Sequence, residues 1–108
     1  MKPGPVAKHV VVHGRVQGVG YRDAAVQAAF TLGVKGWVRN RSDGTVEAHA
    51  QGAPDEVDRF VEWCKRGPPL ARVVKVDARE AAVTAARQEK HQRRQDRETV
   101  DSREPTEL

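Results

Sequence analysis

The chain has 108 residues, which predicts one small domain, and its 19 Lys and Arg against 15 Asp and Glu give a net charge of +4. This mild positive charge favours anionic ligands, while two Trp, two Phe and one Tyr are too few for an interleaved base-stacking surface. The single Cys64 excludes an internal disulfide, and no apolar run approaches the roughly 20 residues that span a bilayer. The N-terminus also lacks the apolar region of a secretory signal, so we expect a cytoplasmic protein without membrane contact.

The first predicted strand covers residues 8–13, which contain three consecutive β-branched valines. Side chains alternate along a strand, so Val10 and Val12 are expected on the face opposite His9 and His13. One of these two faces should therefore join the core.

The glycine-rich run GRVQGVGYR at residues 14–22 follows this strand and leads into a helical pattern. Glycines allow tight turns, and a turn that opens into a helix directs backbone N–H groups and the positive helix end at an anion. Arg22 would add a planar fork of donors that suits phosphate oxygens. The run therefore predicts an anion site.

The first predicted helix covers residues 21–32, which are rich in alanine and contain no Gly or Pro. Asp23 in its first turn suits the helix dipole, and Gly33 is a typical helix stop. Three- and four-residue spacing predicts a buried stripe, formed by Val26, Ala29, Phe30 and Gly33 with Ala25 beside them.

Two strands are predicted next, over residues 34–40 and 45–51, and the Asp-Gly pair between them indicates a hairpin turn at residues 41–44. In the first of these strands Trp37 and Val38 should face opposite sides. In the second, an alternating apolar set predicts a half-buried antiparallel strand, with Val46, Ala48 and Ala50 on the buried face.

A second helix is predicted from Pro54 to the basic pair at residues 65–66, with a stripe formed by Val57, Phe60, Val61 and Cys64. The following Gly-Pro-Pro ends it, and residues 71–79 form a last strand with Val74, Val76 and Ala78 on one side. The order β-α-β-β-α-β predicts an α+β, ferredoxin-like sandwich with two helices on one face of an antiparallel sheet.

The chain changes character near residue 80, which divides a compact domain (1–80) from a charged C-terminal tail (81–108). The tail has residue types that favour helix but no apolar stripe to dock one. It is expected to be an exposed helix or disordered, with disorder toward Glu104 and Pro105.

The glycine-rich run, together with GWVRN, Asp43–Glu47 and QGAPDEV, resembles the acylphosphatase family over about residues 6 to 80. The resemblance implies a monomeric enzyme that hydrolyses the carboxyl–phosphate bond of small acyl phosphates without a metal or organic cofactor. Inorganic phosphate would be a product inhibitor. Members of this family finish with a short extra strand that carries an aromatic residue, but no aromatic follows Trp63, so the presence of a fifth strand stays open.

The resemblance also assigns roles to particular residues. Arg22 would bind the phosphoryl group, and Asn40 would orient the attacking water, with the substrate's own phosphate helping to take the water's proton. A neutral amide suits this position because a carboxylate would repel the dianion. The phosphate cradle would be formed by Arg15, Val16, Gln17, Gly18, Val19, Gly20 and Tyr21.

Three other functions have less support from these residues. Histidines four residues apart on a strand are roughly 13 Å apart and cannot share a metal ion, and Cys64 is expected to be a buried apolar residue. Acylphosphatase-like domains also begin large hydrogenase-maturation carbamoyltransferases, but those continue into cysteine-rich zinc motifs. An RNA-binding domain with this element order would need exposed aromatic residues on its two central strands, which are the first and third. These two predicted strands contain no aromatic residue, so no nucleic-acid partner is expected.

Overall fold

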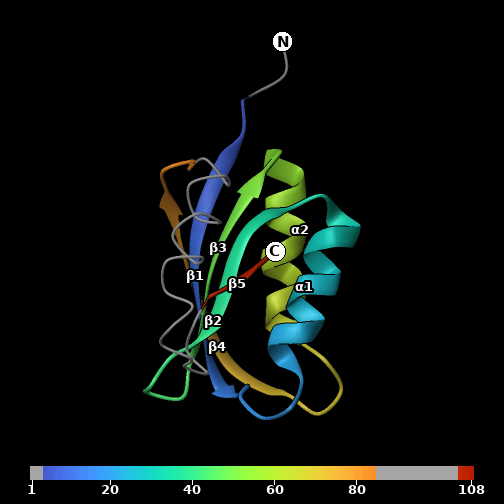
Figure 1. Cartoon of the computed structure of the whole chain (residues 1–108), viewed down its shortest axis with the longest axis vertical. Helices are drawn as coiled ribbons and strands as arrows, with labels where there is room; N and C mark the ends of the chain where they lie inside the picture. The colour runs from blue at the N-terminus through green and yellow to red at the C-terminus, as the bar shows by residue number, and fades with distance from the viewer. Residues whose placement is uncertain (1–3, 85–104) are drawn as a thin grey trace, which may run out of the picture.

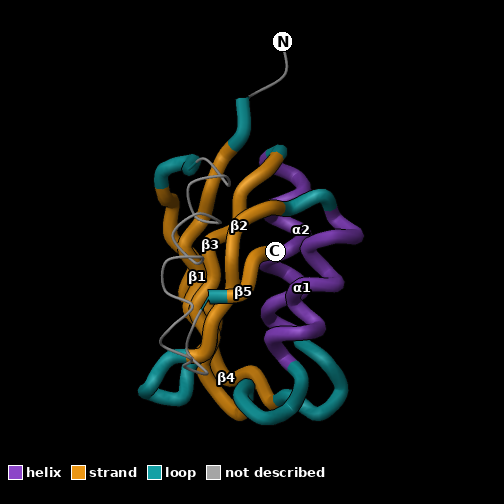
Figure 2. Tube along the Cα trace, in the orientation of Figure 1, coloured by secondary structure: helices purple, strands orange, loops and turns teal. Residues whose placement is uncertain are grey.

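The computed structural model describes residues 4–84 and 105–108. Its elements are β1 (Val6–Arg15), α1 (Tyr21–Leu32), β2 (Lys35–Asn40), β3 (Val46–Gly52), α2 (Pro54–Arg66), β4 (Arg72–Ala81) and β5 (Thr106–Glu107). The strands form one antiparallel sheet in the order β4-β1-β3-β2-β5. Both helices cover the same face of this sheet (Figures 1 and 2). The predicted ferredoxin-like fold is confirmed, with β1 and β3 central.

The core lies between the sheet and the two helices. The alternation predicted for β1 is confirmed, since Val10 and Val12 are buried while His9 and His13 are only half-buried. The predicted stripes of β3 and α2 are also buried, and they consist of Val46, Ala48, Ala50, Val57, Phe60, Val61 and Cys64. These periodic apolar residues hold the two layers together through burial of apolar surface.

The predicted stripe of α1 is buried only at Ala25 and Ala29, since Val26 is half-buried and Gly33, like Phe30, is exposed. Phe30 is 84% exposed, whereas Tyr21, Ala25 and Ala29 are buried. These three residues are four apart and share one face, and Phe30 lies a further 100° around the helix from Ala29. Short alanine side chains therefore bring α1 close to the sheet, and the large ring of Phe30 stays outside.

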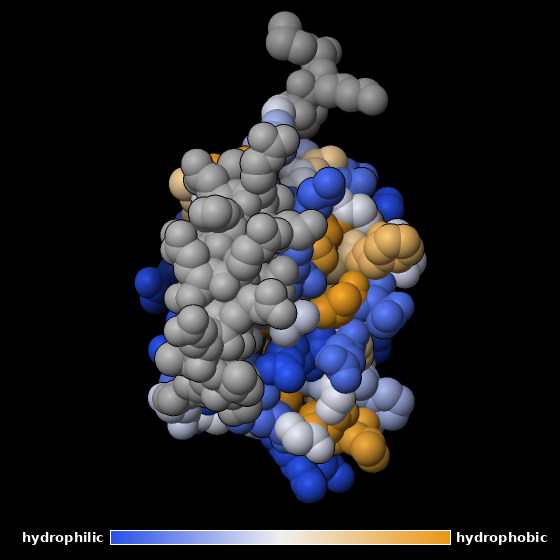
Figure 3. Space-filling model, viewed as in Figure 1, coloured by the Kyte–Doolittle hydropathy of each residue, from blue (hydrophilic) through white to orange (hydrophobic). Residues whose placement is uncertain are grey.

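The expected stripe of β4 is wrong at Val74. The register shifts where His13 pairs with Lys75 but Gly14 pairs with Val73, which leaves Val74 as an extra residue in β4. Such a bulge breaks the alternation of side chains, so Val74 is 80% exposed and Val73 packs against the core instead. On the part of the surface that is coloured in Figure 3, apolar side chains are seen in several separate patches.

The fifth strand is present as the two residues of β5. It pairs with the outer side of β2, Thr106 opposite Val38 and Glu107 opposite Trp37, and the Leu108 N–H donates to the Gly36 carbonyl at 2.8 Å. The end of the chain therefore returns to the sheet instead of continuing as the expected tail. Residues 85–104 of that tail lie outside the described residues, and the domain boundary at residue 80 stays a prediction. None of the helices described is long and apolar enough to cross a membrane.

Candidate active site

A small pocket lies where β1 passes into α1. Figure 1 shows this connection between β1 and α1 at the lower end of the molecule. The pocket has a volume of about 230 Å³. It brings together Arg22 from the first turn of α1 and Asn40 from the last position of β2. The residues that line it are Val16, Gly18, Gly20, Tyr21, Arg22, Asp23 and Asn40.

Two glycines shape the loop that lines this pocket. Gly18 and Gly20 have φ angles of 74° and 79°, in the left-handed region that L side chains rarely adopt. Gly20 is also the N-cap of α1 and has no side-chain cap, so the first N–H groups of the helix keep their capacity to bind a ligand. Half-buried Arg22 follows immediately, and the combination is suited to a phosphoryl group.

Two residues of the predicted cradle line the pocket and are also buried in the core. The side chains of Val16 and Tyr21 are 1% and 2% exposed and belong to the core. The Tyr21 hydroxyl donates to the Cys64 carbonyl at 2.7 Å, and burial raises the pKa of this phenol well above its ordinary value. Burial also raises the pKa of the Cys64 thiol to about 12. Neither group is suited to proton transfer or nucleophilic attack near neutral pH.

Three predicted cradle residues do not line the pocket. Arg15 is exposed and lies opposite Arg72 in the β1–β4 pair, and Val19 packs partly against the core. The Gln17 amide instead donates two hydrogen bonds to the β2–β3 hairpin, to the carbonyls of Arg41 at 2.7 Å and Thr45 at 2.9 Å. Gln17 thus connects the glycine loop to the segment next to Asn40.

Asp23 is a pocket residue that sequence reasoning placed only in the helix. It is exposed and follows Arg22 directly in the first turn of α1. An acidic residue in a first helical turn is common because it suits the dipole, so its sequence position carries no separate signal for a site.

The histidines of the sheet do not line this pocket and have other partners. His9 contacts Glu47 at 2.6 Å, His13 contacts Asp77 at 3.1 Å, and His49 contacts Gln51 at 2.9 Å. Within residues 4–84 and 105–108, no group of three or more His, Cys, Asp or Glu side chains is arranged to hold a metal ion.

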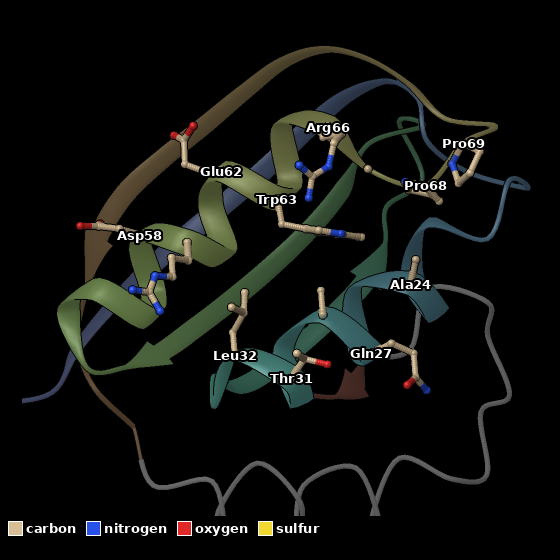
Figure 4. A pocket seen from close by; sticks show the side chains of 13 residues that line it. Ala24, Gln27, Thr31, Leu32, Asp58, Glu62, Trp63, Arg66, Pro68 and Pro69 are labelled. Carbon is tan, nitrogen blue, oxygen red and sulfur yellow. The ribbon is translucent and has the colours of Figure 1, made fainter.

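A larger groove of about 960 Å³ lies between α1 and α2, and it contains none of the predicted site residues. Figure 4 shows Trp63 of α2 reaching between the two helices, with Leu32 and Ala24 on the α1 side. The small pocket has the donors that phosphate chemistry needs, and we therefore take it as the candidate site despite its smaller volume.

A family model described as Acylphosphatase matches residues 8–92. An acylphosphatase of Methylococcus capsulatus is 58% identical over 76 residues, which cover 70% of this chain and 83% of that protein. One from Bordetella parapertussis is 63% identical over 65 residues, covering 60% of this chain and 69% of that protein.

Solved structures show the same likeness. A Coxiella burnetii acylphosphatase superimposes with a TM-score of 0.73 at 40% identity, covering 75% of this chain and 85% of that one. A full-length HypF structure, in a phosphate- and nucleotide-bound form, matches with a TM-score of 0.70 at 28% identity. That match covers 77% of this chain but only 11% of HypF.

Proposed function

Since this chain belongs to the acylphosphatase family and is an enzyme that hydrolyses acyl phosphates, we propose that the reaction takes place in the pocket between the glycine loop, Arg22 and Asn40. The observation that carries the proposal is that Arg22 and Asn40, from different elements, line one pocket with Gly18 and Gly20. One small ligand can thereby contact the Arg22 guanidinium, the backbone N–H groups of the loop and the neutral Asn40 amide.

The phosphoryl group is held first. Its three equatorial oxygens accept hydrogen bonds from the N–H groups of the glycine loop and the first turn of α1, and from the Arg22 guanidinium. These donors are in place before the reaction, so they stabilise the charge of the transition state without a large reorganisation. Arg15, Gln17 and Val19 do not line the pocket, so no contact with the phosphoryl group is proposed for them.

The Asn40 amide then positions water. Its oxygen accepts a hydrogen bond from the water, and its nitrogen donates to a phosphoryl oxygen. The water oxygen attacks phosphorus, the bond from phosphorus to the carboxyl oxygen breaks, and the carboxylate leaves with the electron pair of that bond. The water's proton passes to a phosphoryl oxygen of the substrate. Catalysis therefore consists of positioning and charge stabilisation, without a covalent intermediate.

Further features follow from this proposal. Inorganic phosphate would occupy the same donors and inhibit competitively. One chain supplies every proposed site residue, which fits a monomer. The reaction needs no organic cofactor or metal ion, and the single buried Cys64 suits the cytoplasm.

RNA binding, the alternative with the same element order, has little support. Its recognition surface would be the central strands β1 and β3, and neither carries Phe, Trp or Tyr. Glu47 and Asp77 place carboxylates on or beside these strands, which would repel an RNA backbone.

Hydrolysis of benzoyl phosphate, followed by ultraviolet absorbance with and without a chelator, tests the proposal. We expect Arg22→Ala to lose at least about 10²–10³ in kcat/KM, as for removal of one preorganised oxyanion donor. Asn40→Ala should lower kcat more than it weakens competitive inhibition by inorganic phosphate. Arg59→Ala and Ser42→Ala, which remove exposed side chains, are the matched controls. Turnover of Arg22→Ala at the wild-type level would overturn the assignment of Arg22.

A further inference from the structure

We propose that Gln17 is a positioning residue that holds the phosphate loop in register with the hairpin that carries Asn40. The inference rests on the proposed function, because it concerns the alignment of the two halves of that site. It assigns the Gln17 side chain a role in turnover without contact with the substrate.

The Gln17 amide nitrogen uses both of its hydrogens on the hairpin. It donates to the Arg41 carbonyl at 2.7 Å and to the Thr45 carbonyl at 2.9 Å. These carbonyls lie at the two ends of the turn, since the Arg41 N–H donates back to the Thr45 carbonyl at 2.9 Å. The Gln17 side chain is therefore hydrogen-bonded to both strands of the hairpin, at the turn that joins them.

The hairpin is closed by contacts of its own. Asp43 accepts hydrogen bonds from the Thr45 N–H at 3.0 Å and from the Thr45 hydroxyl at 2.6 Å, and these bonds hold the pKa of the Asp43 carboxyl below its ordinary value. The Gly44 N–H donates to the Arg41 carbonyl at 3.2 Å. Gln17 is thus not required to form the turn, and its two bonds connect one closed turn to the loop.

The connection lies next to both halves of the site. Gln17 stands between Val16 and Gly18, which both line the pocket, and Arg41 follows Asn40 directly. In residues 16–20 Gln17 has the only side chain with polar atoms, so no other side chain of this loop can replace the link. A misplacement of about 1 Å between a bound group and its reaction partner can cost about 10²-fold in rate.

Gln17→Met tests the proposal because methionine keeps the length of the side chain and removes the donor. We expect kcat for benzoyl phosphate to fall roughly 10- to 100-fold while the inhibition constant of inorganic phosphate changes by less than about threefold. Gln51→Met is the control, because Gln51 does not line the pocket. It removes an amide-to-carbonyl bond of 2.7 Å to Thr84, together with the contact of Gln51 with His49 and the bonds that its amide oxygen accepts from Thr84. An unchanged kcat in Gln17→Met, or an equal loss in the control, would overturn the proposal.

Combining Gln17→Met with Asn40→Ala shows whether Gln17 acts through Asn40. We expect the double variant to lose about as much in kcat as Asn40→Ala alone. Once the Asn40 amide that positions the water is removed, the alignment of Asn40 with the loop has no further effect on the rate. Losses that multiply would contradict the proposal. If Asn40→Ala has normal kcat, the proposed water role of Asn40 fails, and Gln17 is then judged by the split between kcat and phosphate inhibition alone.

Gln17→Glu covers the case in which Gln17→Met does not fold. Above its pKa the introduced carboxylate would face two carbonyl oxygens, and below its pKa the acid can donate to one of them. Burial and the facing oxygens should raise that pKa, so kcat relative to wild type should recover as the pH falls. A ratio that does not change with pH would count against the proposal.

Discussion

The Tyr21 hydroxyl donates a 2.7 Å hydrogen bond to the backbone carbonyl of Cys64, which joins the first residue of α1 to the last turn of α2. The Tyr21 ring also lies 5.4 Å from the ring of Trp63. Because Arg22 is the next residue along α1, this contact fixes the start of the helix that carries the proposed phosphate-binding arginine.

Tyr21→Phe should therefore affect stability and not binding. We expect the free energy of unfolding to fall by about 1–3 kcal/mol, since the variant leaves a buried carbonyl without its donor. The inhibition constant of inorganic phosphate should stay at the wild-type value, because the Tyr21 side chain is buried and its hydroxyl is bonded to the Cys64 carbonyl. Urea denaturation and inhibition of benzoyl phosphate hydrolysis measure the two quantities. Weaker phosphate binding by the folded variant would show instead that the hydroxyl takes part in the site.

Gly20→Ala should lower both stability and turnover. A side chain at this position meets no protein atom within 4 Å, but a φ angle of 79° costs an alanine about 1–2 kcal/mol. The loop can relieve that strain only by moving its N–H groups away from the phosphoryl oxygens. Gly33→Ala is the control, because Gly33 has a φ angle of 80° at the other end of α1. The control should lose stability and keep kcat, and a loss of kcat in both variants would argue against a local effect on the loop.

Glu47→Gln should weaken the dependence of stability on acid pH. Burial tends to raise the pKa of Glu47, but hydrogen bonds from His9 and Arg39, both at 2.6 Å, outweigh it and hold this pKa below the ordinary value of 4.5. Glu47 therefore binds a proton more readily in the unfolded chain than in the folded one. The stability that the Glu47 carboxylate contributes is complete above pH 4.5 and is lost as the pH falls through the pKa of Glu47 in the folded protein.

Thermal unfolding between neutral pH and about pH 3 measures this contribution, since a carboxyl with a lowered pKa titrates in that range. The wild type should lose stability more steeply than Glu47→Gln below pH 4.5. Glu62→Gln is the control, because the pair of Glu62 with Lys65 is exposed and contributes little. Parallel curves for wild type and Glu47→Gln would contradict the assignment.

The sequence predicted the fold where apolar residues repeat without interruption. The period of a strand is followed by Val10 and Val12, and that of a helix by Phe60 and Cys64. The face of the element that carries these residues is the buried one. The bulge at Val74 could not be predicted in this way, because an extra residue is defined only against the partner strand. Phe30 was misplaced because a neighbouring alanine face packs more closely than the ring allows.

The candidate site was predictable in part as a set of residues but not as an arrangement. Arg22 and Asn40 followed from the resemblance, and the structure places both in one pocket. The bonds of Gln17 to a turn 24 and 28 residues away exist only once both elements are folded. A motif records that a glutamine is present and not which carbonyls its amide reaches.

Removing residues 105–108 should destabilise the protein and expose an edge of the sheet. The Leu108 side chain packs against the core, its N–H donates to Gly36, and β5 pairs with Val38 and Trp37 of β2. We expect a loss of about 1–3 kcal/mol in the free energy of unfolding, from one partly buried apolar side chain and the backbone hydrogen bonds of β5. The uncovered N–H and C=O groups of β2 would also favour pairing between molecules.

Urea denaturation and sedimentation velocity measure these two effects of the truncation. Leu108→Ser is the matched variant, because it removes the apolar contact and keeps the backbone pairing of β5. It should lose stability without the added self-association, which separates burial from edge protection. The folded fraction of either variant should keep its kcat, since none of residues 105–108 lines the pocket. A truncated chain as stable and as monodisperse as the full chain would show that β5 contributes nothing to the sheet.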